Sequence, residues 1–148
     1  MQEIKIKLQH PDVKVPTYAT DGAGCFDIYA DLPPSCISCR VTADTPTEIE
    51  TGLSFEIPEG KALLVFSRSG HGFKNGVRLA NAVGVLDSDY RGQLKVKLTA
   101  DGAGALVVKH GDRIAQGMII DALQVTFKVV DKLSDTERGI GGFGSTGG

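Results

Sequence analysis

Two carboxylates, Asp87 and Asp89, lie two residues apart in the segment 84–92, between apolar residues and a tyrosine. In a hairpin, alternation places both acids on one face. An acidic β-turn is the plain structural interpretation, because Asp and Ser are common turn residues. Asn81, Gly84 and Tyr90 favour a functional one, since an amide, a bare backbone and a ring together can hold a base and its sugar. Asp87 would then act as general base toward a water molecule.

Arginines next to serine, glycine or glutamine offer binding places for phosphate groups. Arg68, Ser69 and Gly70 directly follow an apolar run, and a guanidinium binds phosphate through paired donors. Arg113 and Gln116 share a strand-like segment, where a salt-bridged structural arginine is the alternative.

One further acid, Asp27, lies within an apolar stretch. Buried acids are normally paired, so we expect an arginine partner for it. Arg68, Arg113 and Arg138 are the candidates, and the sequence alone does not choose among them.

The C-terminal residues 138–148 are mostly glycine, yet they include Arg138, Phe143 and two hydroxyl residues. Composition alone favours a disordered chain end. The single arginine and single ring favour an arm that orders over a nucleotide, with the guanidinium on phosphate and the ring stacked on the base. We therefore expect residues 134–148 to form a mobile, glycine-rich C-terminal arm.

Short strands are the elements that must position these residues. The predicted strands are short, β-branched and bounded by turn residues, and one helical turn is predicted at 69–75. With 19 glycines as turn punctuation, the pattern indicates one all-β domain over residues 1–148, a sandwich or barrel. The predicted strands are 3–8, 47–55, 62–66, 92–98, 106–109 and 124–130.

Composition limits the class of protein. A chain of 148 residues with 41% hydrophobic and 23% charged residues is typical of a single globular domain. The formal net charge of −2 argues against a non-specific nucleic-acid binder, which would be basic. The start has no apolar core of a signal peptide and no run reaches membrane-spanning length, so we expect an intracellular, cytoplasmic protein without membrane or nucleic-acid partners.

The cysteines and histidines do not form a recognisable metal site. Cys36 and Cys39 make a CxxC pair, but zinc needs about four ligands and His10, His71 and His110 are scattered. The two prolines just ahead weigh against a redox motif. We interpret the cysteines as structural or incidental, with redox sensitivity as the alternative.

Five segments in this order strongly resemble the trimeric all-β deoxyuridine triphosphate nucleotidohydrolases (dUTPases). The resemblance extends from the first strand to the last residue. The segments are AGCFDIYA (23–30), RSG (68–70), NAVGVLDSDYRG (81–92), GDRIAQ (111–116) and RGIGGFGSTG (138–147).

The resemblance implies a jelly-roll of the β-clip type and hydrolysis of dUTP to dUMP and pyrophosphate with Mg²⁺. Such an enzyme serves pyrimidine deoxynucleotide metabolism and keeps uracil out of DNA. Three chains would form a homotrimer with active sites at the subunit interfaces. The family's magnesium is held by the substrate phosphates and water, so no direct protein ligand is expected, which fits the preference of Mg²⁺ for keeping its waters.

By the same resemblance, Asp87 is the general base for the water that attacks the α-phosphorus, and Tyr90 packs on the deoxyribose and leaves no room for a 2′-hydroxyl. Asn81 and the backbone of 84–87 match a hairpin that reads uracil, and Asp27 supports the site by orienting the tail arginine or a metal-bound water. The remaining implied roles are phosphate contacts from Arg68, Ser69, Gly70, Gln116, Arg138, Gly144, Ser145 and Thr146, stacking of Phe143 over uracil, and support from Arg113.

Ser67 departs from the family pattern, which usually has proline before the arginine. Serine leaves φ free, and we expect a softer phosphate loop. Cys25 occupies a position that is usually apolar or aromatic, which a small hydrophobe tolerates.

Two other functions remain as alternatives. A dCTP deaminase of the same superfamily would use a glutamate in the hairpin region and would lack the glycine-rich tail. A regulatory, protein-binding member of the family is the second alternative, although the spacing between Arg91 and Arg113 leaves little room for an extra insertion.

Overall fold

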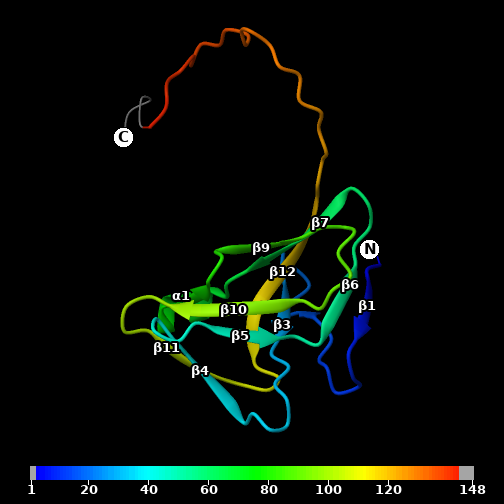
Figure 1. The fold of residues 1–148 in the computed structure, drawn as a ribbon, viewed down its shortest axis with the longest axis vertical. Helices are drawn as coiled ribbons and strands as arrows, with labels where there is room; N and C mark the ends of the chain where they lie inside the picture. The colour runs from blue at the N-terminus through cyan, green and yellow to red at the C-terminus, as the bar shows by residue number, and fades with distance from the viewer. Residues whose placement is uncertain (1–2, 144–148) are drawn as a thin grey trace.

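A computed structural model describes residues 3–143 and shows an all-β jelly-roll domain with one short helix (Figure 1). The predicted helix at 69–75 is confirmed as α1 (Ser69–Asn75). Most predicted strands are confirmed with small shifts of their ends. The strands are β1 (Lys5–Leu8), β2 (Thr17–Tyr18), β3 (Phe26–Tyr29), β4 (Ser38–Thr42), β5 (Thr47–Glu50), β6 (Leu53–Glu56), β7 (Lys61–Phe66), β8 (Val77–Leu79), β9 (Val83–Leu86), β10 (Lys95–Ala100), β11 (Ala105–Lys109) and β12 (Arg113–Asp121).

Antiparallel pairing organises these strands into four sheets. The largest has the order β2-β3-β12-β7-β9, and a three-stranded sheet has the order β5-β10-β8. Two-stranded sheets β1-β6 and β4-β11 complete the domain. In Figure 1 the strands β5 and β10 cross in front of β3 and β12, which gives the domain its layered form.

One cluster of buried apolar side chains fills the space between the sheets. Ile28 and Leu63 come from the five-stranded sheet, and Ile49 and Leu98 come from the three-stranded one; each is at most 1% exposed. Burying an aliphatic side chain of this kind stabilises a protein by about 1.5–3 kcal/mol. The core therefore fixes β3, β7 and β12, the strands that carry or adjoin most of the candidate site.

The ladder between β7 and β9 sets the distance between two groups of candidate residues. Leu63 lies opposite Leu86, and Phe66 lies opposite Val83. Because the strands are antiparallel, β7 leads into Arg68 at one end of the ladder, whereas β9 leads into Asp87 at the other.

The predicted strand at 47–55 is divided into β5 and β6 by Gly52. Gly52 has a φ of +67°, which favours glycine. A Cβ atom at this position would collide with Val13 and lie 2.7 Å from Oδ2 of Asp31. Residue 52, between β5 and β6, must therefore adopt a left-handed backbone conformation and must have no side chain, and only glycine meets both conditions.

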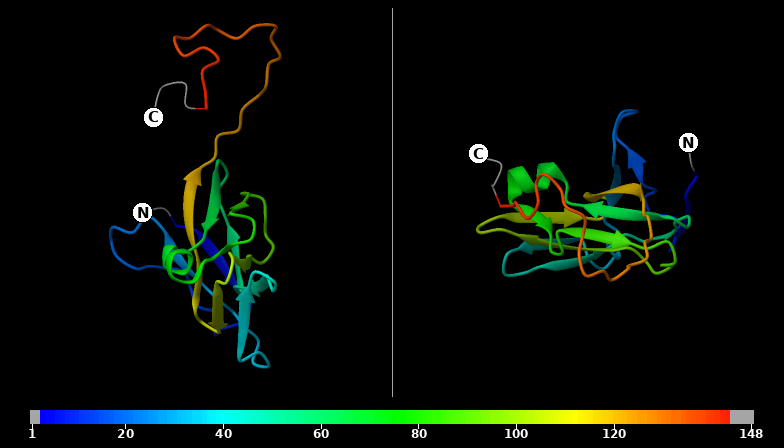
Figure 2. Two further views of the ribbon diagram at one scale, coloured as in Figure 1. Left: turned by 90° about the vertical axis from the view of Figure 1, so that its left-hand side faces the viewer. Right: turned by 90° about the horizontal axis from the view of Figure 1, so that it is seen from above.

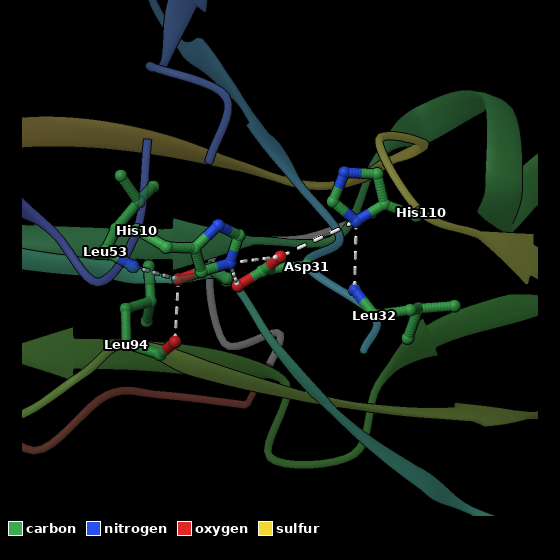
Figure 3. Close-up of polar contacts among 7 residues, drawn as sticks. His10, Asp31, Leu32, Leu53, Leu94 and His110 are labelled. Carbon is green, nitrogen blue, oxygen red and sulfur yellow. Dashed lines mark hydrogen bonds and ion pairs between the residues drawn. The ribbon is translucent and has the colours of Figure 1, made fainter. Parts of the chain in front are cut away.

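Asp31 also joins two histidines that are far apart in the sequence (Figure 3). Nε2 of His10 lies 2.9 and 3.1 Å from the two carboxylate oxygens, and Nδ1 of His110 lies 3.5 Å from one of them. The backbone N–H of Leu32 donates to Nδ1 of His110 at 3.2 Å. Within residues 3–143 no group of three or more His, Cys, Asp or Glu side chains is arranged to hold a metal ion. His10, Asp31 and His110 all lie outside helices and strands, and His71 is not part of this contact.

The predicted strand at 124–130 is wrong for the single chain. The chain leaves the domain after β12, and residues 122–143 run outward in an open arc without helix or strand (Figures 1 and 2). The predicted alternation is present, with Val125, Phe127 and Val129 exposed at 59, 94 and 96%. A strand needs a neighbour for its backbone hydrogen bonds, and no strand between residues 3 and 143 pairs with this segment.

The thiols of Cys25, Cys36 and Cys39 are free and half-buried. Burial, with a smaller contribution from the neighbouring Cys36, raises the pKa of the Cys39 thiol. Among the described residues, no helix is long and apolar enough to cross a membrane.

Gly52→Ala is expected to destabilise the domain more than Gly60→Ala. Both glycines have positive φ, so each substitution loses about 1–2 kcal/mol of unfolding free energy through the backbone alone. A Cβ atom at Gly60 has open space, whereas one at Gly52 meets Val13 and Asp31, which adds about 1–3 kcal/mol. Urea unfolding at one protein concentration measures the difference, and equal losses would show that Val13 and Asp31 adjust without strain.

Candidate active site

A carboxylate between two arginines forms the centre of the first group of candidate residues. Asp27 on β3 is 9% exposed, and Nε of Arg68 donates to its Oδ1 at 3.2 Å. Nη1 of Arg113, at the start of β12, donates to its Oδ2 at 3.2 Å. Of the three partners that the sequence left open for Asp27, the described chain pairs it with two. Arg138 instead donates from Nε to the backbone oxygen of Gly141 at 2.8 Å.

This cluster retains positive charge and hydrogen-bond donors that face solvent. Two guanidinium groups against one carboxylate leave a net charge of +1. Each guanidinium has five donors, and the contact with Asp27 occupies one of them. The side chains of Arg68 and Arg113 are 23 and 50% exposed, so their remaining donors can reach an anion in solution.

Gln116 and α1 lie beside the same cluster. Gln116 on β12 is opposite both Asp27 on β3 and Phe66 on β7. Directly opposed residues of an antiparallel ladder share a face, so the Gln116 amide lies on the face of Asp27. Ser69 and Gly70 open α1 and are exposed, next to Arg68. The structure therefore brings the phosphate candidates of two separate segments, 68–70 and 113–116, together beside Asp27.

The hairpin residues form a second group. Asn81 lies in the turn between β8 and β9, where Ala82 has a φ of +62°. A Cβ atom at Gly84 would lie 3.3 Å from that of Val65, so glycine permits the close approach of β9 to β7. A groove of about 460 Å³ is lined by Asn81, Gly84 and Leu94 among others. The groove has a bare backbone edge and an amide, which suits a flat, polar ring.

Asp87 and Tyr90 border an adjoining hollow of about 260 Å³. The backbone N–H of Tyr90 donates to the oxygen of Asp87 at 3.2 Å, which closes a turn. The Tyr90 hydroxyl donates to the oxygen of Gln93 at 3.1 Å and packs the ring over Gly92, where a Cβ atom would collide with it. The ring is thus held in place, and the Asp87 carboxylate is exposed beside it.

The two groups are far apart within one chain. The register places Leu63 opposite Leu86, the residue before Asp87, and the three residues from Leu63 to Phe66 span about 10 Å at about 3.3 Å per residue. Arg68 follows two residues later. Across the sheet, β12 and β7 separate β3 from β9, which adds about 14 Å at about 4.8 Å per strand. Asp87 and the Asp27 cluster of the same chain therefore do not form one continuous site.

The tail residues lie away from both groups. Arg138 and Phe143 belong to the arm that extends from the domain, and Phe143 is fully exposed with a φ of +51° (Figure 2). Gly144, Ser145 and Thr146 lie outside the described residues.

Two residues that sequence reasoning did not select also contact this region. The hydroxyl of Ser67 accepts a hydrogen bond from the backbone N–H of Leu79, and Nε2 of His71 donates to the backbone oxygen of Arg113. At position 67 the sequence shows only a departure from the proline that is usual in the family. Ser67 binds a backbone group 12 residues away, and His71 binds one 42 residues away. No local sequence pattern indicates contacts of this length.

Comparison with known proteins shows the family of this chain. A family model described as dUTPase matches residues 11–147. A deoxyuridine 5'-triphosphate nucleotidohydrolase of Dinoroseobacter shibae is 44% identical over 143 residues, covering 91% of this chain and 88% of that protein. One from Caulobacter vibrioides is 46% identical over 139 residues, covering 92 and 87%.

A solved structure of a Staphylococcus bacteriophage 80alpha dUTPase mutant with dUpNHpp has the same fold. The TM-score is 0.86 at 23% identity, and 99% of each chain is covered. Because the family model matches nearly the whole length and two relatives exceed 40% identity, this chain belongs to the dUTPase family.

Proposed function

We propose that this chain is a dUTP diphosphatase, which hydrolyses dUTP to dUMP and pyrophosphate. The observation that carries the proposal is the cluster of Arg68 and Arg113 on Asp27, with net positive charge and donors open to solvent. Membership of the dUTPase family and the names of the relatives support the same substrate.

Asp87 is the proposed general base. It would take a proton from a water molecule while the water oxygen bonds to the α-phosphorus. The bond from the α-phosphorus to the oxygen that bridges to the β-phosphate breaks, and pyrophosphate leaves. Arg68 and Arg113 would stabilise negative charge on the phosphates, with Ser69, Gly70 and Gln116 as further contacts, because fixed donors need no reorganisation during the reaction.

The hairpin would provide base and sugar selectivity. A rigid backbone edge at 84–87, with Asn81, rejects cytosine because the donor and acceptor groups would be left unpaired. The thymine methyl group would be excluded by lack of space. The Tyr90 ring is held over Gly92 by its bond to Gln93, so it can pack on the sugar and exclude a 2′-hydroxyl.

Magnesium would accompany the triphosphate as its counter-ion. Phosphate oxygens and water suit Mg²⁺, which prefers six oxygen ligands and keeps several waters. The Asp27 cluster does not suit the ion, because both of its carboxylate oxygens already accept bonds from arginine. When bound, the ion would neutralise charge on the phosphates.

We propose that a complete site needs more than one copy of the chain, in a homotrimer. The separation of Asp87 from the Asp27 cluster supports this, because a general base must lie within hydrogen-bond reach of its water. The arm supports it as well, since its exposed stripe of Leu123, Val125, Phe127 and Val129 would be covered by a neighbouring copy. Arg138, Phe143 and the following glycine-rich residues would then close over a neighbour's substrate.

Two alternative functions would give different products from the same purified protein. A dCTP deaminase would release ammonia from dCTP, whereas Asp87, Ser88 and Asp89 stand where that enzyme would need a glutamate. A purely regulatory member would release no pyrophosphate from any nucleotide. Assays of both pyrophosphate release and ammonia release with dUTP, dCTP, dTTP and UTP separate the three functions.

Asp87→Asn is expected to bind dUTP with nearly unchanged affinity and to lose about two to four orders of magnitude in kcat, because the amide cannot accept the proton. Single-turnover kinetics and calorimetric binding of a non-hydrolysable dUTP analogue measure the two effects.

Glu59→Gln is the matched control, since Glu59 is an exposed acid that lines a hollow together with Asp87. It removes the same charge from the same hollow and should change kcat less than about threefold. Near-normal turnover by Asp87→Asn would exclude Asp87 as the base, and equal losses in both variants would point to the charge of the hollow instead.

A mixture of Asp87→Asn and Arg68→Gln chains is expected to regain activity after subunit exchange. If each site uses Asp87 of one chain and Arg68 of the next, every mixed trimer contains one intact site. At equal amounts about three quarters of trimers are mixed, so about one quarter of wild-type activity returns. No recovery after exchange, verified by mass spectrometry of tagged chains, would place both residues of each site in one chain.

A further inference from the structure

Helix α1 carries the proposed phosphate contacts but has no hydrophobic anchorage. It has seven residues, none of them buried, and no side chain caps its N-terminus. Phe73, its one large apolar residue, is 94% exposed. Isolated helices of this length are unstable in water. Contacts other than apolar packing must therefore hold the segment in place.

Ser67 provides one such contact immediately before Arg68. Its hydroxyl oxygen lies 2.9 Å from the backbone nitrogen of Leu79, whose N–H donates to it. Leu79 is 2% exposed and lies on β8, which pairs with β10 along one edge only. Ser67 thus satisfies a buried donor on the free edge of β8 and joins the end of β7 to the base of the hairpin.

His71 provides a second contact immediately after Gly70. Its Nε2 lies 2.8 Å from the backbone oxygen of Arg113. A carbonyl oxygen only accepts, so Nε2 carries the hydrogen. Arg113 is the residue whose guanidinium binds Asp27, and Asp27 also binds Arg68. His71 therefore ties α1 to the strand that completes the arginine cluster.

We propose that Ser67 and His71 are positioning residues that hold the segment Arg68–Gly70 from both sides and set the affinity of the site for phosphate groups. Neither side chain is expected to touch the substrate. Each acts through the backbone, Ser67 on β8 and His71 on β12. The proposal rests on the function proposed above only in its choice of phosphate as the ligand.

The test uses Ser67→Ala and His71→Ala, with Ser67→Thr and His71→Gln as conservative variants that keep a hydroxyl or an N–H donor. Calorimetry with inorganic pyrophosphate and Mg²⁺ measures phosphate affinity without dUTP turnover. Amide hydrogen exchange measures the order of residues 68–76. Steady-state kinetics with dUTP and dCTP give KM, kcat and base preference.

Matched controls remove comparable contacts elsewhere in the domain. Thr51→Val removes a buried hydroxyl that donates to the oxygen of Leu94 at 2.7 Å and accepts from the N–H of Leu53. His10→Gln removes an imidazole that contacts Asp31. Both controls are expected to leave the pyrophosphate affinity unchanged.

Ser67→Ala and His71→Ala should each raise the Kd for pyrophosphate and the KM for dUTP by about 5- to 30-fold, as loss of a hydrogen bond of ordinary strength implies. We expect kcat to change less than KM and the preference for dUTP over dCTP to stay the same. Amide hydrogen exchange at residues 68–76 should become faster. The conservative variants should recover the pyrophosphate affinity of the wild-type protein.

Unchanged pyrophosphate affinity in both alanine variants would overturn the proposal, as would an altered base preference in Ser67→Ala, because the hydroxyl would then act on the hairpin. If the wild-type protein bound pyrophosphate but did not hydrolyse dUTP, the proposed function would be wrong. The pyrophosphate affinities and the hydrogen exchange of the variants would still test the positioning role of Ser67 and His71.

Discussion

The carboxylate of Asp27 between Arg68 and Arg113 is the interaction on which the site depends. It lies on a central strand and is nearly buried, so it is stable as an anion only with cationic partners. Two arginines supply this compensation, so Asp27 keeps a cationic partner if either one is removed. The contact also draws the end of β7 and the start of β12 to β3. One carboxylate thus gathers two guanidinium groups whose mutual repulsion would otherwise separate them.

The same sheet keeps the proposed general base away from this cluster. The antiparallel ladder of β7 and β9 sends Arg68 and Asp87 to opposite ends, and two strands separate β3 from β9. A rigid sheet cannot bend to close such a gap. The separation of the candidate residues and the exposed apolar stripe of the arm both support the homotrimer proposed above, because each would be explained by contact with another copy of the chain.

Helix α1 illustrates how a binding segment is held without a core of its own. Its exposed face leaves Ser69 and Gly70 accessible to a ligand, which apolar packing on that side would prevent. The hydrogen bond that Ser67 accepts, the one that His71 donates and the ion pair of Arg68 hold the helix by directional contacts in place of apolar packing. The softer loop expected from serine at 67 stays a prediction. The structure adds that the Ser67 hydroxyl accepts a hydrogen bond from the buried N–H of Leu79.

The sequence by itself determined the all-β class, the helix at 69–75 and the strands β1, β5 to β7, β10 and β11, because periodicity and turn residues are local properties. Its short motifs also predicted a nucleotide site that includes Asp27, Arg68 and Asp87. It also led to the wrong prediction of a strand at 124–130, because the alternation of Val125, Phe127 and Val129 indicates an apolar face but not a pairing strand. Only the tertiary structure decided that Asp27 pairs with two arginines, that His10 and His110 meet at Asp31, and that Ser67 and His71 reach backbone groups on other strands. These contacts join residues 12 to 86 positions apart, and their geometry follows from strand order and register, which no local pattern encodes.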